Sequence, residues 1–252
     1  MDAVFKTDVG QTRAHNEDDG AFAVNSHGQV LVLVADGMGG HQAGDVASQM
    51  TKESLLKKWL DTDNFETPKE AEQWLSESVQ RINGELYDHA QHHTDCQGMG
   101  TTIVAALCTH DFITIAHVGD SRVYLSSAQG FRQLTGDHSL VGELVRSGQI
   151  SEDEAMNHPR RNVVLRALGT EAEVKIDLET IDWDEGSYLL LCTDGLTDKV
   201  SNKEIEKELL EGRGLTETVD SLIQIANDRG GEDNVTIAIV RLETENEGGE
   251  QS

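Results

Sequence analysis

The chain has 252 residues, and its 46 Asp and Glu against 20 Lys and Arg give a formal net charge of -26. An acidic surface of this kind repels phosphate backbones and anionic lipid, so nucleic acids and membranes are disfavoured as partners. With 37% hydrophobic residues and two prolines, the chain is long enough to bury a sizeable core, and its sequence contains no Pro-rich or Ser-rich linker that would divide it.

The N-terminus and the cysteines favour a reducing compartment. Residues 1–6 lack the basic and then apolar pattern of a signal peptide, and no apolar run approaches the length of a membrane helix. The three cysteines, Cys96, Cys108 and Cys192, are scattered and odd in number, which does not fit a disulfide framework. We therefore expect a cytoplasmic protein, and we expect it to act as a monomer.

The first part of the chain predicts strands followed by a pair of helices. Apolar patterning places strands at 2–9, 20–26 and 29–36. Helices are expected at 43–60 and 68–91, where apolar residues recur at three- and four-residue spacing.

The middle of the chain predicts an antiparallel meander and then an irregular segment. Short turns separate four expected strands, at 101–109, 112–118, 121–126 and 131–134. Residues 139–170 keep neither a helix nor a strand period for long, which is typical of a functional loop.

The last part predicts strands, two helices and a final strand, at 173–182, 187–193, 201–211, 216–229 and 234–242. Each of the two helices is expected to begin at a Ser or Thr cap. Runs of strands that alternate with helix pairs indicate an α+β fold in which helices cover the outer faces of antiparallel sheets. The polar, acidic residues 243–252 are expected to be disordered.

An apolar stretch near the N-terminus ends in an aspartate and a glycine-rich turn. Residues 30–34 are all aliphatic and lead through Ala35 to Asp36, Gly37 and then Met38-Gly39-Gly40. Such a run is typical of a strand buried on both faces. A carboxylate at the end of that strand is either a turn residue or a ligand for a cation, because an isolated buried charge is costly.

Other acids stand at similar places and favour the second interpretation. Asp194 follows another apolar strand, Asp233 precedes the last strand, and Asp120 follows a third. Glu17 and Asp18 lie between strands near the N-terminus. Carboxylates without Cys or His at ligand spacing fit Mg²⁺ or Mn²⁺ better than Zn²⁺. Two such ions can activate a water for attack on phosphorus.

Seven short motifs occur in the order found in the metal-dependent protein phosphatases of type 2C (PPM-type), and the chain resembles the compact bacterial serine/threonine members of that family. The motifs lie at residues 13–18, 35–40, 98–102, 118–122, 134–139, 192–196 and 231–236. The resemblance implies a four-layer α-β-β-α sandwich over residues 1–242, with a mobile flap at about 142–168.

The same resemblance implies a binuclear Mn²⁺ or Mg²⁺ centre, with a third ion in some bacterial members. Asp36 would bridge both ions, and the Gly37 carbonyl would supply another oxygen. Asp194 and Asp233 would hold one ion. Arg13 would bind the phosphate, because its guanidinium can form a bidentate fork with phosphate oxygens.

The remaining motif residues have supporting roles by this resemblance. Glu17 and Asp18 would act largely through metal-bound waters, and Asp120 would contribute to the third-ion position. Asn234 and Thr102 would not bind the ions themselves but would hold the ligands in position.

The implied reaction is direct hydrolysis of phosphoserine or phosphothreonine by a metal-bridging water or hydroxide. The substrates would be phosphorylated proteins, and the enzyme would oppose a cognate Ser/Thr kinase. Some family members carry a histidine directly after the Asp-Gly pair as general acid, but here that residue is Met38, which cannot donate a proton. His41 and a metal-bound water are candidates for that role, although a polar residue at a helix N-terminus is the simpler interpretation of His41.

Two other functions remain open at this point. One is a catalytically silent module that binds phosphosites without hydrolysing them. The other is a phosphodiesterase or nuclease that uses the same metals, although the acidic composition argues against it.

Overall fold

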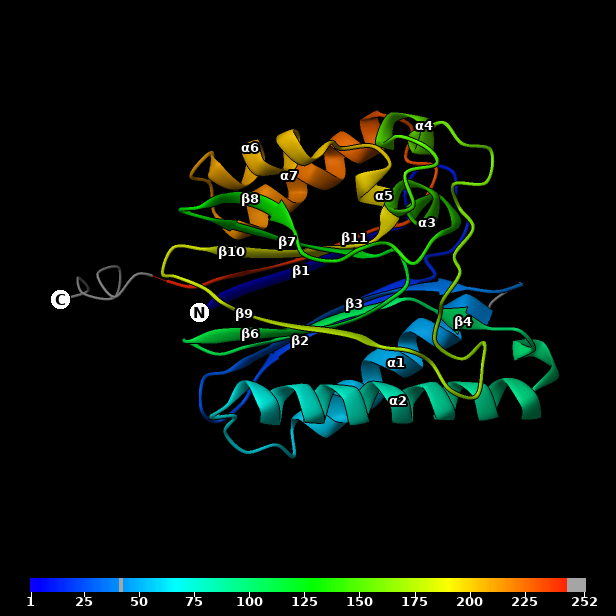
Figure 1. Ribbon diagram of the computed structural model, residues 1–252, viewed down its shortest axis with the longest axis horizontal. Coiled ribbons are helices and arrows are strands. Elements are labelled where there is room, and N and C mark those ends of the chain that lie inside the picture. Colours follow the sequence, from blue (N-terminus) through cyan, green and yellow to red (C-terminus); the bar gives the residue numbers. More distant parts are fainter. Residues whose placement is uncertain (41–42, 244–252) are drawn as a thin grey trace.

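The computed structural model describes residues 1–40 and 43–243, so His41 and the predicted tail from residue 244 onwards lie outside the described part. Two antiparallel sheets face each other, and a pair of helices covers the outer face of each (Figure 1). This confirms the predicted α+β sandwich of four layers.

The strand order places the N-terminal and C-terminal strands together in one sheet. That first sheet contains, in spatial order, β1 (Asp2–Asp8), β11 (Val235–Arg241), β10 (Tyr188–Cys192), β7 (Arg122–Ser127) and β8 (Gly130–Gln133). The second sheet contains β2 (Asp18–Val24), β3 (Val30–Met38), β5 (Ile103–Cys108), β6 (Phe112–Val118) and β9 (Asp177–Asp182), and the short β4 (Gly100–Thr101) pairs with β3.

The long helices lie on the two outer faces. Helices α1 (Ala43–Trp59) and α2 (Pro68–His92) cover the second sheet, and α6 (Asn202–Leu210) and α7 (Leu215–Asp228) cover the first. A 3₁₀ turn (Thr94–Cys96) follows α2. Three short helices, α3 (Leu140–Arg146), α4 (Glu152–Met156) and α5 (Asp194–Thr197), lie with β4 at one end of the sandwich (Figure 1).

The alternation of side chains explains why β3 is an unbroken apolar run. Leu31 and Leu33 pack into the cluster beneath α1 and α2, whereas Val32 and Val34 pack into the cluster between the sheets. Because successive side chains of a strand point to opposite faces, only a strand covered on both sides needs apolar residues at every position. The strand β3 therefore runs through the centre of the molecule and carries Asp36 to one end of it.

Two strand boundaries differ from the prediction near Asp36. Strand β3 continues past Asp36 to Met38, because Gly37 and Met38 pair with Thr101 and Gly100. The strand expected at 101–109 is correspondingly divided into β4 and β5. Asp36 therefore lies on paired backbone instead of in a free turn.

Two other boundaries also differ. The strand expected from residue 173 begins only at Asp177, the first residue that pairs with β6, whereas the carbonyls of Glu171 and Ala172 accept hydrogen bonds from the amide of Asn83 on α2. The helix expected from residue 216 begins at Leu215, with Gly214 as its N-cap, so the predicted Thr cap of this helix was wrong.

Helix α2 has the cap that α7 lacks. Thr67 accepts a hydrogen bond from the backbone N–H of Glu70, and the Glu70 carboxylate accepts from the Thr67 N–H. We expect Thr67→Ala to lower the free energy of unfolding by about 1 kcal/mol, because this reciprocal cap is lost. Urea unfolding measures it. The matched control is Thr216→Ala in α7, which removes no cap and should leave the stability unchanged or slightly higher. Equal losses in both variants would contradict the assignment.

Candidate metal centre

Asp36 and Asp18 face each other across two neighbouring strands. They are direct partners in the β2–β3 register. The Oδ2 atom of Asp18 accepts hydrogen bonds from the hydroxyls of Thr193 (2.8 Å) and Thr236 (2.7 Å). Burial raises the pKa of Asp18 to about 7, although these two hydrogen bonds oppose the shift. Thr193 and Thr236 stand in the recognised motifs, but sequence reasoning gave them no role.

Gly37 lies where the backbone of three segments meets. A Cβ atom at Gly37 would stand 2.2 Å from the carbonyl oxygen of Gly44 and 2.4 Å from that of Glu17. The Gly37 N–H donates to the Glu17 carbonyl at 3.0 Å. Only glycine allows α1 and the Glu17 loop to approach β3 this closely.

Thr102 and Asn234 hold the backbone on which the acids stand. The Thr102 hydroxyl accepts from the N–H of Asp36 (3.0 Å), and the Thr102 N–H donates to the Asp36 carbonyl (2.9 Å). The Asn234 side chain accepts from the N–H of Glu17 (2.8 Å) and donates to the carbonyls of Val9 and His15. Both contacts fix main chain next to a carboxylate and leave the carboxylates free.

Asp194 and Asp120 extend the acidic end of the sandwich. Asp194 is the first residue of α5, and its Oδ1 atom is buried with no hydrogen-bond partner in residues 1–40 and 43–243. Asp120 lies in the β6–β7 turn and is 8% exposed. Burial raises the pKa of both groups, that of Asp120 to about 6, and for Asp194 the neighbouring Asp120 and Asp198 raise it further.

Asp36 lies at the electrostatic centre of this group. Burial raises its pKa well above the usual range, and the charges of Asp18, Asp194, Asp120 and Asp233 raise it further. Acids that come from β2, the β6–β7 turn, α5 and the loop before β11 therefore act on one carboxyl group at the end of β3.

The donor set suits a hard divalent cation. A buried carboxylate oxygen without a partner and several mutually repelling acids are both relieved by bound Mg²⁺ or Mn²⁺. Among the described residues, no group of three Asp, Glu, His or Cys side chains is already arranged so that it could bind a metal ion. The residues fit the ions chemically, and their side chains would have to turn inward to close around them.

Arg13 lies beside one of the acids. Its Nη2 atom is 2.8 Å from Oδ2 of Asp233, and its Nε donates to the carbonyl of Glu232 at 3.3 Å. The Arg13 side chain is about half exposed, at 47%. Its guanidinium can therefore turn toward a ligand that approaches the acids from solvent.

Two further acids belong to this end of the molecule, and sequence reasoning missed their relation to it. Asp45, in the first turn of α1, raises the pKa of Glu17 after burial, and its Oδ1 atom is buried without a hydrogen-bond partner in the part of the chain described here. Asp198 is the second, and its charge is one of those that raise the pKa of Asp194 and Asp120. It also forms an ion pair with Arg161 at 3.5 Å. The four-residue spacing between Asp194 and Asp198 is the feature of the sequence that could have indicated this relation.

Comparison with known proteins identifies the family. The profile of protein phosphatase 2C matches residues 10–237. The chain belongs to the protein phosphatase 2C family. It is 47% identical to the serine/threonine phosphatase stp of Listeria monocytogenes over 252 residues, which is 100% of each chain. It is 37% identical to protein phosphatase PhpP of Streptococcus pneumoniae over 245 residues, 97% of this chain and 99% of that protein.

Solved structures agree with the sequence comparison. The serine/threonine phosphatase Stp1 of Staphylococcus aureus has a TM-score of 0.89 and 41% identity, with 96% of this phosphatase and 95% of Stp1 covered. The catalytic domain of the phosphatase PstP in complex with two manganese ions has a TM-score of 0.85 and 32% identity, with 96% and 98% covered. These findings confirm the recognised family, the fold and the activity of a protein-serine/threonine phosphatase. No helix of residues 1–40 and 43–243 has the length and apolar character needed to cross a membrane.

Proposed function

We propose that this phosphatase hydrolyses phosphoserine and phosphothreonine in proteins at the acidic end of the sandwich, with two Mn²⁺ or Mg²⁺ ions as cofactors. The convergence of charge on Asp36 supports this most strongly, because four other acids raise its pKa after burial does. When bound, the two ions supply a Lewis acid and an activated water for direct attack on phosphorus.

The chain supplies the ligands from several elements. Asp36 would bridge the two ions, with the Gly37 carbonyl beside it, and Asp194 and Asp233 would hold one of them. The unpartnered Oδ1 atom of Asp194 supports its assignment.

The remaining ligands complete the arrangement. Glu17 and Asp18 would contact the ions largely through water, and Asp120 would contribute to a third position. Asp18 is already bound through Oδ2 to Thr193 and Thr236, which leaves Oδ1 for that purpose.

Arg13 would bind the phosphate. It now pairs with Asp233, so binding of substrate and binding of metal are linked through these two side chains. The fork of Arg13 that now holds the Asp233 carboxylate would bind phosphate oxygens in the same way. Met38 cannot supply the proton that the leaving alcohol needs. That His41 acts as the general acid stays a prediction.

The partners follow from the reaction. The substrates would be proteins phosphorylated by a cognate Ser/Thr kinase, and relatives named as serine/threonine phosphatases support this. A silent phosphosite-binding module would bind the same peptides without releasing phosphate.

The test is phosphate release from phosphoserine and phosphothreonine peptides with saturating Mn²⁺, by wild type and by Arg13→Ala. We expect release by wild type and none after chelation. The variant should lose about 10- to 100-fold in kcat/KM, mainly through KM, because a charged phosphate contact is worth roughly 1.5–3 kcal/mol. Lys6→Ala, which removes a cation from β1 that pairs with Asp220, is the matched control and should act like wild type. Peptide binding without any phosphate release would establish the silent module instead.

A further inference from the structure

A single histidine holds the backbone that precedes Asp120. Gly119, in the β6–β7 turn, donates its N–H to Nδ1 of His138 at 3.0 Å, and its carbonyl accepts the His138 backbone N–H at 2.8 Å. Gly119 has a φ of +116°, and a Cβ atom there would lie 2.5 Å from the side chain of Thr102. Glycine is required at this turn and is also its most deformable residue, so the two hydrogen bonds to His138 restrict it.

The hydrogen bond from Gly119 determines the tautomer of His138. Because Nδ1 accepts a proton donor, the ring proton must be on Nε2. The Nε2–H group then donates to Oδ2 of Asp177 at 3.1 Å. Nη1 of Arg166 donates to the other oxygen of Asp177 at 2.9 Å and lies 3.0 Å from Nε2 of His138, so Asp177 and Arg166 both pack against this edge of the ring. A carboxylate that fixes a histidine tautomer in this way is the arrangement that orients ligands in many metal sites.

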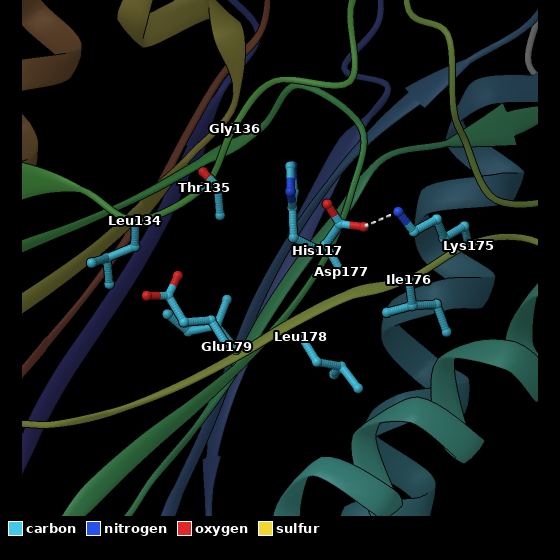
Figure 2. A pocket seen from close by; sticks show the side chains of 10 residues that line it. His117, Leu134, Thr135, Gly136, Lys175, Ile176, Asp177, Leu178 and Glu179 are labelled. Atoms are coloured by element: carbon cyan, nitrogen blue, oxygen red, sulfur yellow. Dashed lines mark ion pairs between the residues drawn. The ribbon is translucent and has the colours of Figure 1, made fainter. Parts of the chain in front are cut away.

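The His138 ring is also packed. It is 4% exposed and stacks on His117, with ring centroids 4.4 Å apart. His117 and Asp177 are among the residues that line a cavity of about 480 Å³ (Figure 2). Small molecules can therefore reach the neighbourhood of His138 from solvent.

Asp120 needs restraint because other acids repel it. After burial, the charge of Asp137 raises its pKa most, and that of Asp198 also contributes. The turn that carries this carboxylate sets its position among the other acids, so restraint of the turn keeps it close to charges that repel it.

We propose that His138, oriented by Asp177, is a positioning residue that fixes the Gly119–Asp120 turn and thereby directs the Asp120 carboxylate into the metal centre. The proposal rests on the proposed function, since it requires that Asp120 bind an ion. His138 itself touches neither the ions nor the substrate. The competing interpretation is a buried histidine that only contributes to stability.

The test is calorimetric titration of the metal-free protein with Mn²⁺, with thermal unfolding measured beside it. We expect His138→Ala to weaken the affinity for the ion that Asp120 binds by about 10-fold or more, which is the usual cost of removing a residue that orients a ligand. The affinities for the more tightly bound ions should not change. His138→Asn should keep most of the affinity, because its side-chain oxygen can still accept from the Gly119 N–H. Lys175→Gln is the matched control, since Lys175 is 78% exposed and 3.9 Å from Asp177, and it should bind Mn²⁺ like wild type.

Chemical rescue separates positioning from stability. Imidazole that enters through the cavity should restore Mn²⁺ affinity to His138→Ala and have no effect on wild type. If His138→Ala does not fold, Asp177→Ala takes its place and should show a smaller loss of affinity for the same ion. Wild-type affinities for every ion in the folded variant, whatever its thermal stability, would overturn the proposal. Failure of the wild-type protein to bind any Mn²⁺ would overturn the proposed function itself.

Discussion

Replacement of Asp36 by Asn is expected to lower kcat/KM for p-nitrophenyl phosphate about a thousandfold or more, while the protein stays folded. Asparagine keeps the shape of the side chain but removes the charge on which the other acids converge. Metal ions contribute several kcal/mol to the transition state, and each factor of ten corresponds to about 1.4 kcal/mol. Steady-state kinetics with saturating Mn²⁺ measures the loss. Activity within tenfold of wild type would contradict a role for Asp36 as bridging ligand.

The same substitution is expected to stabilise the metal-free protein near pH 8. Burial and four neighbouring acids make the charged form of Asp36 unfavourable in the folded state, so removal of the charge relieves that cost. Thermal unfolding in chelator should show a midpoint a few degrees higher. Asp63→Asn, which removes the same charge from an exposed loop, is the matched control and should leave the midpoint unchanged. A loss of both activity and metal-free stability would indicate a structural role for Asp36 instead.

The second large effect is the pH dependence of the metal-free protein. Burial raises the pKa of Asp18 from 3.8 to about 7 and that of Asp120 from 3.8 to about 6, and those of Asp36 and Asp194 move in the same direction. Between about pH 4 and pH 7 these four carboxyl groups therefore bind more protons in the folded than in the unfolded chain, and the buried His117, whose pKa burial lowers to about 4, offsets only part of the difference. The free energy of unfolding then falls as pH rises through this window, because the slope follows the difference in bound protons.

Bound Mn²⁺ should reverse this trend, since it favours the ionised carboxylates and competes with protons. We expect the stabilisation by Mn²⁺ to be small at pH 5 and to increase toward pH 8. Urea unfolding at several pH values, with Mn²⁺ and with chelator, measures both curves. A metal-free protein whose stability rises from pH 5 to pH 8 would show that the carboxylates are not held together at this end of the fold.

The strands that determine the fold could be predicted because their signal is local. Leu31 and Val32 pack on opposite faces of β3, so the covering of both faces appears directly in the sequence as an unbroken apolar run. The same holds for β10, where Leu189 and Leu190 pack into different clusters. Asp36 and Asp194 became candidate metal ligands because each follows such a run within two residues.

Other parts of the site depend on contacts between distant segments, and the sequence carries no local signal for them. Asp45 acts on Glu17 only because α1 crosses β3 at Gly37. His138 and Asp177 are brought together by the edge strand β9, whose start the sequence placed four residues too early. Boundaries next to tertiary hydrogen bonds, such as those of Asn83, have no periodic pattern that reports them.

The most direct test of the account is anomalous diffraction at the manganese edge from crystals grown with Mn²⁺. The account predicts at least two anomalous peaks at the acidic end of the sandwich, both in contact with the carboxylate of Asp36 and one of them also with Asp194 and Asp233. A single peak, or peaks that do not touch Asp36, would contradict the two-metal centre on which the proposed function depends.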